Sequence, residues 1–377
     1  MRYYIIAGEA SGDLHASNLI KSLIQTDESA EVRAMAGELS KAAGAQLYKD
    51  YKETAVMGVV EVIKKAGKIL NNLNDCKRDI INFNPDVIIL VDYPGFNMKI
   101  AKFAKKRGFK VFYYIAPKVW AWKEHRVKLL KKYVDRLYII FPFEKEYFKE
   151  RGVDAFYFGN PLADLSKYVK TDTAFQLFKN RHNLKSDKYI ALLPGSRKME
   201  INYLMPKFME LYKLLKQSQY ADYKLLIAQV SSVDEAIYLQ YINGEDIDLI
   251  IDDSRDILQF CQCAVICSGT ASLEGALLGA KHLVCYGFNK VSYAIAKKFV
   301  KIKYVSLPNI IAGKEVVREL IQNDSTPENI FNEIDKILSD REYAAKMESD
   351  FQEIRINLNG EGASNRIAES IFNTIKG

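Results

Sequence analysis

Four turns in the sequence combine small residues with groups that can bind a ligand or accept a proton, and each follows an apolar run. The first turn, Ala7–Asp13, reads AGEASGD. Its glycines let a ligand approach the backbone, while Glu9 and Asp13 would repel a pyrophosphate, so the turn favours a sugar or another hydroxyl-bearing ligand. The spacing of its glycines differs from that of the dinucleotide-binding motif. The alternative interpretation is a tight turn in which Ser11 or Asp13 caps the following helix.

The second turn, Val91–Asn97, places a carboxylate directly after an apolar run. It reads VDYPGFN, and Asp92 would lie at the mouth of a ligand site, where a general base is needed. An aspartate that caps the following helix is the alternative interpretation of the same residue.

The third and fourth turns are suited to an anion. Leu193–Arg197 reads LPGSR, so backbone N–H groups lie beside an arginine that can pair with phosphate oxygens in a bidentate manner. We expect this turn to bind a diphosphate rather than to be a plain surface loop. The fourth turn, Cys267–Glu274, reads CSGTASLE; its small residues begin a helix, and Glu274 can accept hydrogen bonds from a ribose diol. A capped helix without a ligand is the alternative.

Two further segments combine apolar and basic residues. Segment 117–136 contains both tryptophans of the chain among lysines and arginines, and segment 57–73 is an apolar stretch with helical character that carries three lysines. Such mixtures are typical of membrane surfaces and acyl-binding surfaces, whereas core packing of the rings and an ordinary amphipathic helix are the alternatives. The residues predicted to contact lipid or acyl chains are Met57, Val60, Ile63, Trp120 and Trp122.

Composition limits the class of protein. The chain has 377 residues, enough for two domains, and its 49% hydrophobic and 27% charged residues are typical of a soluble globular protein. No run approaches the roughly 18 apolar residues of a membrane-spanning helix, and the N-terminal apolar run is too short for an export signal. Five cysteines without zinc or redox spacing and four scattered histidines predict that no metal is bound. We therefore expect a cytoplasmic protein.

The positive charge is concentrated in one part of the chain. The net charge is +7, yet residues 99–151 alone contain sixteen Lys and Arg against five Asp and Glu. Clustered basic residues attract anionic lipid headgroups or nucleic acid, although solvated helix faces have the same composition. Nucleic acid is the weaker choice, because the aromatic residues are not interleaved as a stacking platform and the rest of the chain is net acidic.

Continuous apolar runs alternate with helical stretches along the chain, which predicts parallel sheets covered on both faces. The predicted strands are Tyr3–Ala7, Val87–Val91, Val111–Ile115, Leu137–Phe141, Tyr189–Leu193, Leu225–Ala228, Leu249–Ile251, Ala264–Cys267 and Leu283–Tyr286. The alternation pauses near Gly159 and resumes at Lys188. We therefore predict an α/β protein of two doubly wound, Rossmann-like domains, residues 1–165 completed by helices in 340–377, and residues 166–339. Ligands should bind beyond the carboxyl ends of the strands, in a cleft between the domains.

Six blocks of the sequence, in order along the chain, together resemble the lipid-A-disaccharide synthases. They are AGEASGD at 7–13, PKVWAW at 117–122, FPFE at 141–144, LLPGSR at 192–197, SGTASLE at 268–274 and YVSLPNIIAG at 304–313. The resemblance implies a GT-B fold and an inverting transfer of 2,3-diacylglucosamine from UDP-2,3-diacylglucosamine to 2,3-diacylglucosamine 1-phosphate, without a metal or other cofactor. It also implies a β-1,6-linked disaccharide product and a peripheral position on the inner face of a bacterial inner membrane. Anionic inner-membrane lipids are expected partners, and a homodimer is possible.

The resemblance also implies roles for individual residues. Asp92 matches the aspartate that is proposed as the catalytic base of the family, and it would take the proton from the acceptor's 6-hydroxyl. The implied UDP-binding residues are Arg197, Ser268, Gly269, Thr270, Glu274, Asn309, Glu315 and Gln322. The implied acceptor-binding residues are Ser11, Gly12 and Asp13.

The chain departs from the family pattern at a few positions. Many members have an aspartate where Gly95 stands, so Asp92 is the only carboxylate of its turn; Asn160 replaces a common histidine, and Arg318 a common proline or lysine. The alternative enzyme is another GT-B protein that acts on UDP-N-acetylglucosamine, either a transferase or an epimerase. A non-catalytic nucleotide-sugar or lipid-binding protein is the alternative from another class, which the presence of Asp92, Arg197 and Glu274 disfavours.

Overall fold

Two parallel β-sheets, each covered by helices on both faces, make up the part of the chain that the computed structural model describes. The described residues are 1–54, 66–163, 170–242, 244–251, 253–287, 303–358 and 362–377. They form two compact units, residues 1–161 with 358–377 and residues 162–357. The predicted fold class, α/β with two doubly wound sheets, is confirmed. The chain returns to the first unit at Leu358, whereas the sequence pattern placed that return at Asp340.

The first sheet has seven strands among the described residues, in the order β3-β2-β1-β4-β5-β6-β7, and the pairs are parallel. Its strands are β1 (Arg2–Ala7), β2 (Glu31–Ala36), β3 (Gln46–Asp50), β4 (Val87–Val91), β5 (Lys110–Tyr114), β6 (Arg136–Ile139) and β7 (Ala155–Tyr157). The central strand β4, VIILV, is buried along its whole length, as expected of a strand with helices on both sides.

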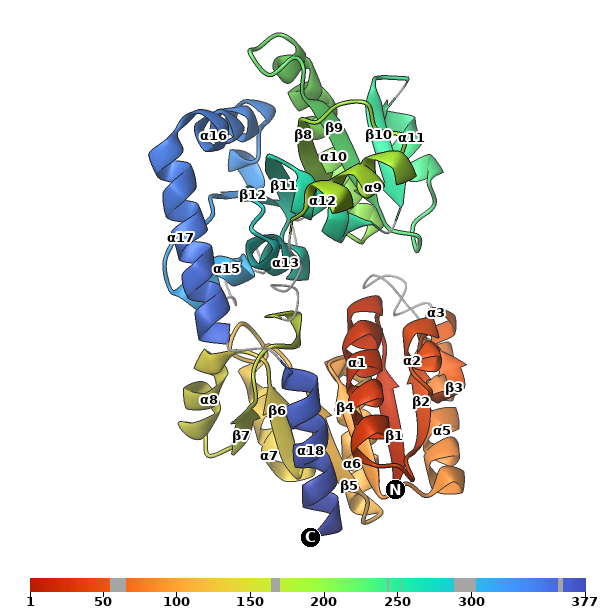
Figure 1. Ribbon diagram of the computed structural model, residues 1–377. Coiled ribbons are helices and arrows are strands. Elements are labelled where there is room, and N and C mark those ends of the chain that lie inside the picture. The colour runs from red at the N-terminus through yellow and green to blue at the C-terminus, as the bar shows by residue number, and fades with distance from the viewer. Residues whose placement is uncertain (55–65, 164–169, 243, 252, 288–302, 359–361) are drawn as a thin grey trace. The chain divides into compact units, whose positions relative to one another are not determined.

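Helices cover this sheet in two layers. Helices α1 and α18 lie side by side on one face, with α2 next to α1, and α5, α6 and α7 form the other layer (Figure 1). The helices of this unit are α1 (Ala10–Thr26), α2 (Glu38–Ala42), α3 (Tyr51–Thr54), α5 (Ala66–Phe83), α6 (Pro94–Lys106), the 3-10 turn η1 (Glu124–Arg126), α7 (Val127–Tyr133), α8 (Pro142–Lys149) and α18 (Ala363–Lys376). The C-terminal helix thus completes the layer that α1 begins.

The second sheet repeats the same winding with six strands among the described residues, in the order β10-β9-β8-β11-β12-β13. Its strands are β8 (Tyr189–Leu193), β9 (Lys224–Gln229), β10 (Ile247–Ile251), β11 (Cys263–Cys267), β12 (His282–Tyr286) and β13 (Glu319–Ile321). Its helices are α9 (Asp172–Arg181), α10 (Lys198–Lys216), α11 (Ala236–Ile242), α12 (Ser254–Phe260), α13 (Thr270–Leu278), α15 (Leu307–Ala312), η3 (Gln322–Asp324), α16 (Pro327–Ser339) and α17 (Arg341–Leu358). Helix α10 packs between α11 and α16 on one face of this sheet.

The nine strands predicted from apolar runs are all present, with ends that differ by one or two residues. Four further strands, β2, β3, β7 and β13, were missed. Strand β3, QLYKD, is mostly polar and only partly buried, and β7 and β13 have three residues each. They lie toward the sheet edges, where one-sided burial does not require a continuous apolar run.

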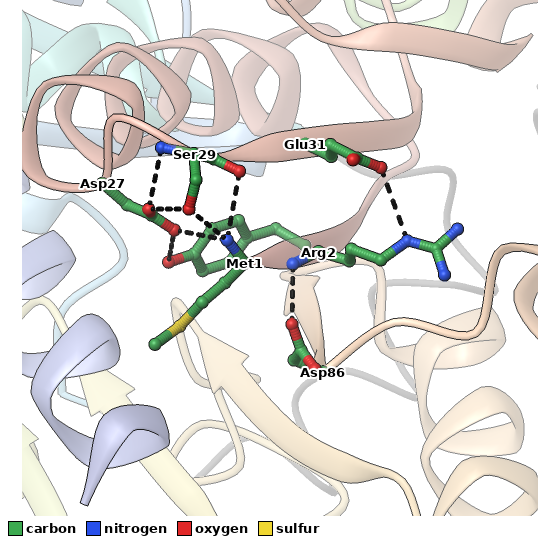
Figure 2. Close-up of polar contacts among 7 residues, drawn as sticks. Met1, Arg2, Asp27, Ser29, Glu31 and Asp86 are labelled. Atoms are coloured by element: carbon green, nitrogen blue, oxygen red, sulfur yellow. Dashed lines mark hydrogen bonds and ion pairs between the residues drawn. The ribbon is translucent and has the colours of Figure 1, made fainter.

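A set of polar contacts holds the amino end of β1 (Figure 2). The carboxylate of Asp27 accepts hydrogen bonds from the ammonium group of Met1 at 2.8 Å, from the hydroxyl of Tyr3 at 3.0 Å and from the hydroxyl of Ser29 at 2.8 Å. Burial alone would raise the pKa of Asp27, but these hydrogen bonds outweigh it and lower the pKa. The ionised carboxylate therefore stabilises the sheet at the end opposite to the one where the predicted turns lie.

Candidate functional site

In each sheet the strand order reverses at one place, and the four turns predicted to bind ligands follow the strands that meet there. In the first sheet β1 pairs with β4, and Ala7 lies level with Val91. In the second sheet β8 pairs with β11, and Leu193 lies level with Ile266. Open α/β sheets bind their ligands at this reversal point, beyond the carboxyl ends of the strands. We call residues 8–13 and 92–97 the β1–β4 site, and residues 194–197 and 268–274 the β8–β11 site.

Asp92 begins a turn whose backbone is unusual and firmly held. The φ angles of Asp92 and Tyr93 are 43° and 47°, in the left-handed region that residues other than glycine seldom occupy. The carbonyl oxygen of Asp92 accepts hydrogen bonds from Nδ2 of Asn97 at 2.8 Å and from the hydroxyl of Tyr113 at 2.6 Å. Sequence reasoning missed both donors, although Asn97 was part of the motif. They fix the direction in which the turn leaves β4.

The environment of Asp92 suits a general base. The side chain is partly buried, and this burial raises the pKa of Asp92 to about 6. The positive charge of Lys118 opposes the rise, and the negative charge of Glu9 adds to it. Asp92 is therefore ionised at neutral pH, with a pKa close enough to the working pH to accept a proton.

The residues predicted to bind the acceptor lie at the start of α1, and one of them, Asp13, forms hydrogen bonds with the start of α2. Ser11 is exposed and Gly12 is buried. The buried carboxylate of Asp13 accepts hydrogen bonds from the N–H groups of Gly37 at 2.9 Å and Ser40 at 3.2 Å, and from the Ser40 hydroxyl at 2.5 Å. Asp13 thus caps α2 and joins it to α1, and its contact with the acceptor stays a prediction.

Gly8 and Gly95, two glycines of the β1–β4 site, differ in whether the surrounding atoms leave room for a side chain. A Cβ atom on Gly8 would lie 2.3 Å from the ring of Tyr93, which stacks on Phe96 with 5.4 Å between centroids. Only glycine fits beneath that ring. Gly95 is exposed, and a Cβ atom there would meet nothing within 4 Å. Packing would thus allow the aspartate that many family members have at this position.

The residues predicted to contact lipid divide into three groups. Met57, Val60 and Ile63 lie outside the described residues. The indole N–H of Trp120 donates a hydrogen bond to Glu144 at 3.0 Å, and its ring packs edge-on against Phe143 at 5.1 Å. Trp120 is thus partly buried and bonded within its own unit, and its contact with lipid stays a prediction. Trp122 is 52% exposed, and Nζ of Lys123 lies 4.0 Å above its ring.

In the turn after β8, two backbone N–H groups donate to a carboxylate of the protein itself. The buried Glu200 accepts hydrogen bonds from the N–H groups of Ser196 at 3.1 Å and Arg197 at 3.2 Å. A Cβ atom on Gly195, whose φ is 109°, would lie 2.5 Å from the same carboxylate. These N–H groups are thus bonded to Glu200, and the binding of diphosphate by this turn stays a prediction. The guanidinium of Arg197, whose side chain is 54% exposed, lies 3.2 Å from Oε1 of the same Glu200.

The N-terminus of α13 lies beside this arginine turn. Its N-cap residue is Gly269, no side chain caps the helix, and the first turn contains no acidic residue. A Cβ atom on Gly195 would lie 3.2 Å from Sγ of Cys267, so the arginine turn lies against the end of β11. The hydroxyl of Ser268 donates to the carbonyl of Val305 at 3.2 Å. Gly269 and Thr270 thus begin a helix whose first N–H groups suit an anion, and their contact with UDP stays a prediction.

Glu274 lies one turn into α13 and is mostly buried. Burial raises the pKa of Glu274, and the charge of Arg255 lowers it, with Nη2 of Arg255 3.9 Å from the carboxylate. Sequence reasoning did not identify Arg255, which comes from α12. The pair leaves Glu274 suited to accept hydrogen bonds from a diol.

Asn309, predicted to lie close to UDP, is fully buried. Its Nδ2 donates to the carbonyl of Val317 and to Glu319, both at 2.8 Å, and its Oδ1 accepts from the N–H of Val317 at 2.9 Å. The carboxamide is thus bonded to the protein's own groups, and the contact of Asn309 with UDP stays a prediction. Glu319, which the sequence did not single out, also accepts the N–H of Val305 at 2.9 Å. Asn309 and Glu319 thus fix the position of Val305, whose carbonyl accepts the hydrogen bond from the Ser268 hydroxyl.

The last two predicted UDP residues flank β13, with Glu315 before the strand and Gln322 directly after it. Glu315 is half-exposed and pairs with Arg318 at 3.3 Å. Gln322 has a left-handed φ of 59°, and its carbonyl accepts a hydrogen bond from Tyr203 at 2.7 Å. Gln322 and Tyr203 line a cavity of about 450 Å³ together with Lys207. Gln322 therefore borders open space, whereas Glu315 is a surface residue.

No three His, Cys, Asp or Glu side chains in the described ranges are grouped so that they could hold a metal ion. No helix there is both long enough and apolar enough to cross a bilayer.

Comparisons with known proteins distinguish between the enzymes that the site could serve. The family described as "Lipid-A-disaccharide synthetase" matches residues 3–374 of the chain. The chain belongs to this family. The lipid-A-disaccharide synthase of Geobacter metallireducens is 36% identical over 370 residues, covering 97% of this chain and 95% of the relative. That of Trichlorobacter lovleyi is 33% identical over 381 residues, covering 100% and 98%. As a member of this family the protein is a glycosyltransferase of lipid A biosynthesis.

Solved structures agree on the fold of this synthase family member. A UDP-N-acetylglucosamine 2-epimerase from Neisseria meningitidis bound to UDP-GlcNAc matches with a TM-score of 0.70 and 14% identity, covering 99% of this chain and 100% of that chain. The glycotransferase of kitacinnamycin matches with a TM-score of 0.61 and 13% identity, covering 99% and 98%. At such identities the likeness shows the fold alone, so the epimerase alternative gains no support beyond the shared architecture.

Proposed function

We propose that this enzyme transfers 2,3-diacylglucosamine from UDP-2,3-diacylglucosamine to 2,3-diacylglucosamine 1-phosphate, with inversion at the anomeric carbon. The products are a β-1,6-linked disaccharide 1-phosphate and UDP. The observation that carries the proposal is Asp92, a carboxylate at the reversal point of the first sheet whose burial raises its pKa to about 6. Family membership supports the choice of substrates.

Asp92 supplies the proton acceptor that a single displacement needs. Its carboxylate takes the proton of the acceptor's 6-hydroxyl while that oxygen bonds to the anomeric carbon of the donor. The bond from the anomeric carbon to the diphosphate breaks at the same time, and its electron pair leaves with UDP. Attack from the face opposite to the leaving group inverts the anomeric carbon. The first unit binds the acceptor, with Ser11 and Gly12 at the start of α1 as its predicted contacts.

The β8–β11 site binds the UDP part of the donor in this proposal. Arg197 and the start of α13 stabilise the negative charge that develops on the diphosphate, and Glu274 accepts hydrogen bonds from the ribose. Asn309, Glu315 and Gln322 are the further residues predicted to lie close to UDP. No other cofactor is part of the proposal, and whether the enzyme forms a homodimer stays a prediction.

The reaction is tested with detergent-dispersed UDP-2,3-diacylglucosamine and 2,3-diacylglucosamine 1-phosphate, in the presence of a chelator and without added metal. We expect equimolar release of UDP and of a disaccharide 1-phosphate identified by mass. UDP-N-acetylglucosamine, offered in parallel, should be left unchanged. Consumption of that sugar together with neglect of the acylated donor would contradict the proposed substrates and favour the alternative enzyme.

Arg197→Ala should weaken the binding of UDP about tenfold or more, because a hydrogen bond to a charged group contributes roughly 1.5–3 kcal/mol. Isothermal titration with UDP measures the effect. Lys188→Ala is the matched control, since Lys188 is 53% exposed at the amino end of the same strand, where it pairs with Asp222. Equal affinities of Arg197→Ala and the unmodified enzyme would remove Arg197 from the donor site.

Asp92→Asn should lower kcat about 100-fold or more while it leaves the Kd for UDP near that of the unmodified enzyme, because the amide keeps the shape but cannot accept the proton. In the unmodified enzyme kcat/KM should fall as the pH drops through about 6, where Asp92 becomes protonated. Asp86→Asn is the matched control: Asp86 precedes the same strand, and its carboxylate accepts the N–H of Arg2 at 2.8 Å (Figure 2). Near-normal turnover of Asp92→Asn would exclude Asp92 as the base.

We also propose that the enzyme binds the surface of an anionic membrane through the face formed by η1 and α7. Trp122 just before η1 is 52% exposed and Leu129 on α7 is 37% exposed. Exposed lysines surround these apolar side chains, namely Lys123, Lys128, Lys131 and Lys132. An exposed indole among lysines is suited to the boundary between headgroups and acyl chains.

Replacing Lys128, Lys131 and Lys132 by glutamine should reduce binding to phosphatidylglycerol vesicles more than tenfold, since each lysine near an anionic surface contributes about 1 kcal/mol. Cosedimentation measures the bound fraction, and phosphatidylcholine vesicles should bind both proteins weakly. The control replaces Lys185, Lys213 and Lys216 of the second unit, which changes the net charge equally. Equal losses in the two triple variants would mean that net charge alone, and not this face, governs binding.

A further inference from the structure

The segment Pro117–Trp122 leaves the end of β5 and is held against helix α8 by two hydrogen bonds. The indole N–H of Trp120 donates to Oε1 of Glu144 at 3.0 Å. One turn further along α8, the hydroxyl of Tyr147 donates to the carbonyl of Val119 at 3.2 Å. The segment is therefore fixed to α8 from both its backbone and its side chains.

Glu144 is almost fully buried, at 1% exposure, yet its carboxylate has donors on both oxygens. Oε1 accepts from Trp120, and Oε2 accepts from the N–H groups of Ile140 at 3.2 Å and Phe141 at 3.1 Å. A buried carboxylate is tolerated only when such donors replace water. Glu144 thus joins three parts of the first unit: the end of β6, the start of α8 and the segment after β5.

The segment follows β5, and the end of β5 is bonded to Asp92. The N–H of Asp92 donates to the carbonyl of Tyr114, the last residue of β5, at 3.1 Å. The segment is bounded by two residues with left-handed backbone, Ile115 at φ 63° and Lys123 at φ 54°. Such a conformation in a β-branched residue persists only where surrounding contacts impose it. The charge of Lys118 lowers the pKa of both Asp92 and Glu144, so the ammonium lies within electrostatic range of both carboxylates.

We propose that Glu144 is a positioning residue for the transfer reaction, because its buried carboxylate holds the segment Pro117–Trp122, and with it Lys118, in place beside Asp92. This inference rests on the proposed function, in which Asp92 is the base. Glu144 itself touches no substrate: it acts through Trp120 and through the backbone of the segment. Lys118 then keeps Asp92 ionised and adds a positive charge next to the acceptor.

The hydrogen bonds that Glu144 accepts depend on pH. Burial raises the pKa of Glu144 to about 7, against the smaller lowering effects of Trp120, the two backbone N–H groups and Lys118. The other titratable group that faces it is Tyr157 on β7, whose own pKa Glu144 helps to raise. Above pH 7 both carboxylate oxygens accept hydrogen bonds. As the pH falls through about 7, one carboxylate oxygen is protonated and becomes a donor. Glu144 then loses the hydrogen bonds that this oxygen accepted, either from Trp120 or from the N–H groups of Ile140 and Phe141.

The kinetic test compares Glu144→Gln with Glu146→Gln, a matched change on an exposed glutamate of the same helix. The amide of glutamine can accept on one side only, so Glu144→Gln should lower kcat about tenfold or more while the KM for the donor changes less than about twofold. Trp120→Phe, which keeps a ring but removes the N–H, should lower kcat similarly. Combining the two changes should add little, because both remove the same contact.

The pH profile separates positioning from plain stability. In the unmodified enzyme kcat/KM should fall in two steps as the pH drops, one near 7 from Glu144 and one near 6 from Asp92. Glu144→Gln should lose the step near 7 and keep the step near 6. A general loss of stability would lower the activity at every pH without removing one step.

A measurement without substrate keeps the test independent of the proposed reaction. In a Trp122→Phe background Trp120 is the single tryptophan, and its fluorescence should shift with a midpoint near pH 7. The shift should vanish in Trp122→Phe with Glu144→Gln. Failure of Asp92→Asn to lose activity would overturn the proposed base but leave this titration intact. Glu144→Gln with normal kcat and an unchanged two-step profile, or a flat titration of Trp120, would overturn the role of Glu144.

Discussion

The carboxamide of Asn97 joins the carboxyl ends of two neighbouring parallel strands, and the geometry of the β1–β4 site follows from it. Its Nδ2 lies 3.4 Å from the carbonyl of Ile6 in β1, 3.2 Å from that of Val91 in β4 and 2.8 Å from that of Asp92. Where parallel strands stop, their last carbonyl groups no longer have a ladder partner and must find one elsewhere. A fully buried asparagine meets that need and, in doing so, directs Asp92 away from the strand.

Internal carboxylates satisfy many of the helix starts in both units. Asp13 binds the first N–H groups of α2, Glu144 those of α8 and Glu200 those of α10. Each of them occupies a position that could otherwise bind an external anion. The start of α13, where Gly269 provides no side chain, is different. No side chain caps the start of α13, next to Arg197, so its first N–H groups suit an anion. The N–H groups of the Arg197 turn are instead bonded to Glu200.

The same two-sheet architecture serves epimerases and transferases alike, so the architecture does not select the reaction. What differs is the chemistry at the carboxyl ends of the strands, where turns can change without disturbing a buried sheet. In this chain those turns place a carboxylate with a pKa of about 6 in one unit and an arginine beside an uncapped helix in the other. A base on one side and a place for a leaving diphosphate on the other are the two requirements of an inverting glycosyl transfer.

The sequence by itself determined the fold class, nine of the strands and the turns that hold Asp92, Arg197 and Glu274. It could do so because strands buried on both faces must be continuously apolar, and because motif residues adjacent in the chain keep their spacing in the fold. Only the tertiary structure decided which polar groups the protein uses for itself. Asn309 and Trp120 were predicted to contact ligand and lipid, and the structure adds their partners within the protein, Glu319 and Glu144, which lie on other elements. Hydrogen bonds between distant segments leave no periodic pattern in a sequence, so burial and partner geometry alone could reveal them.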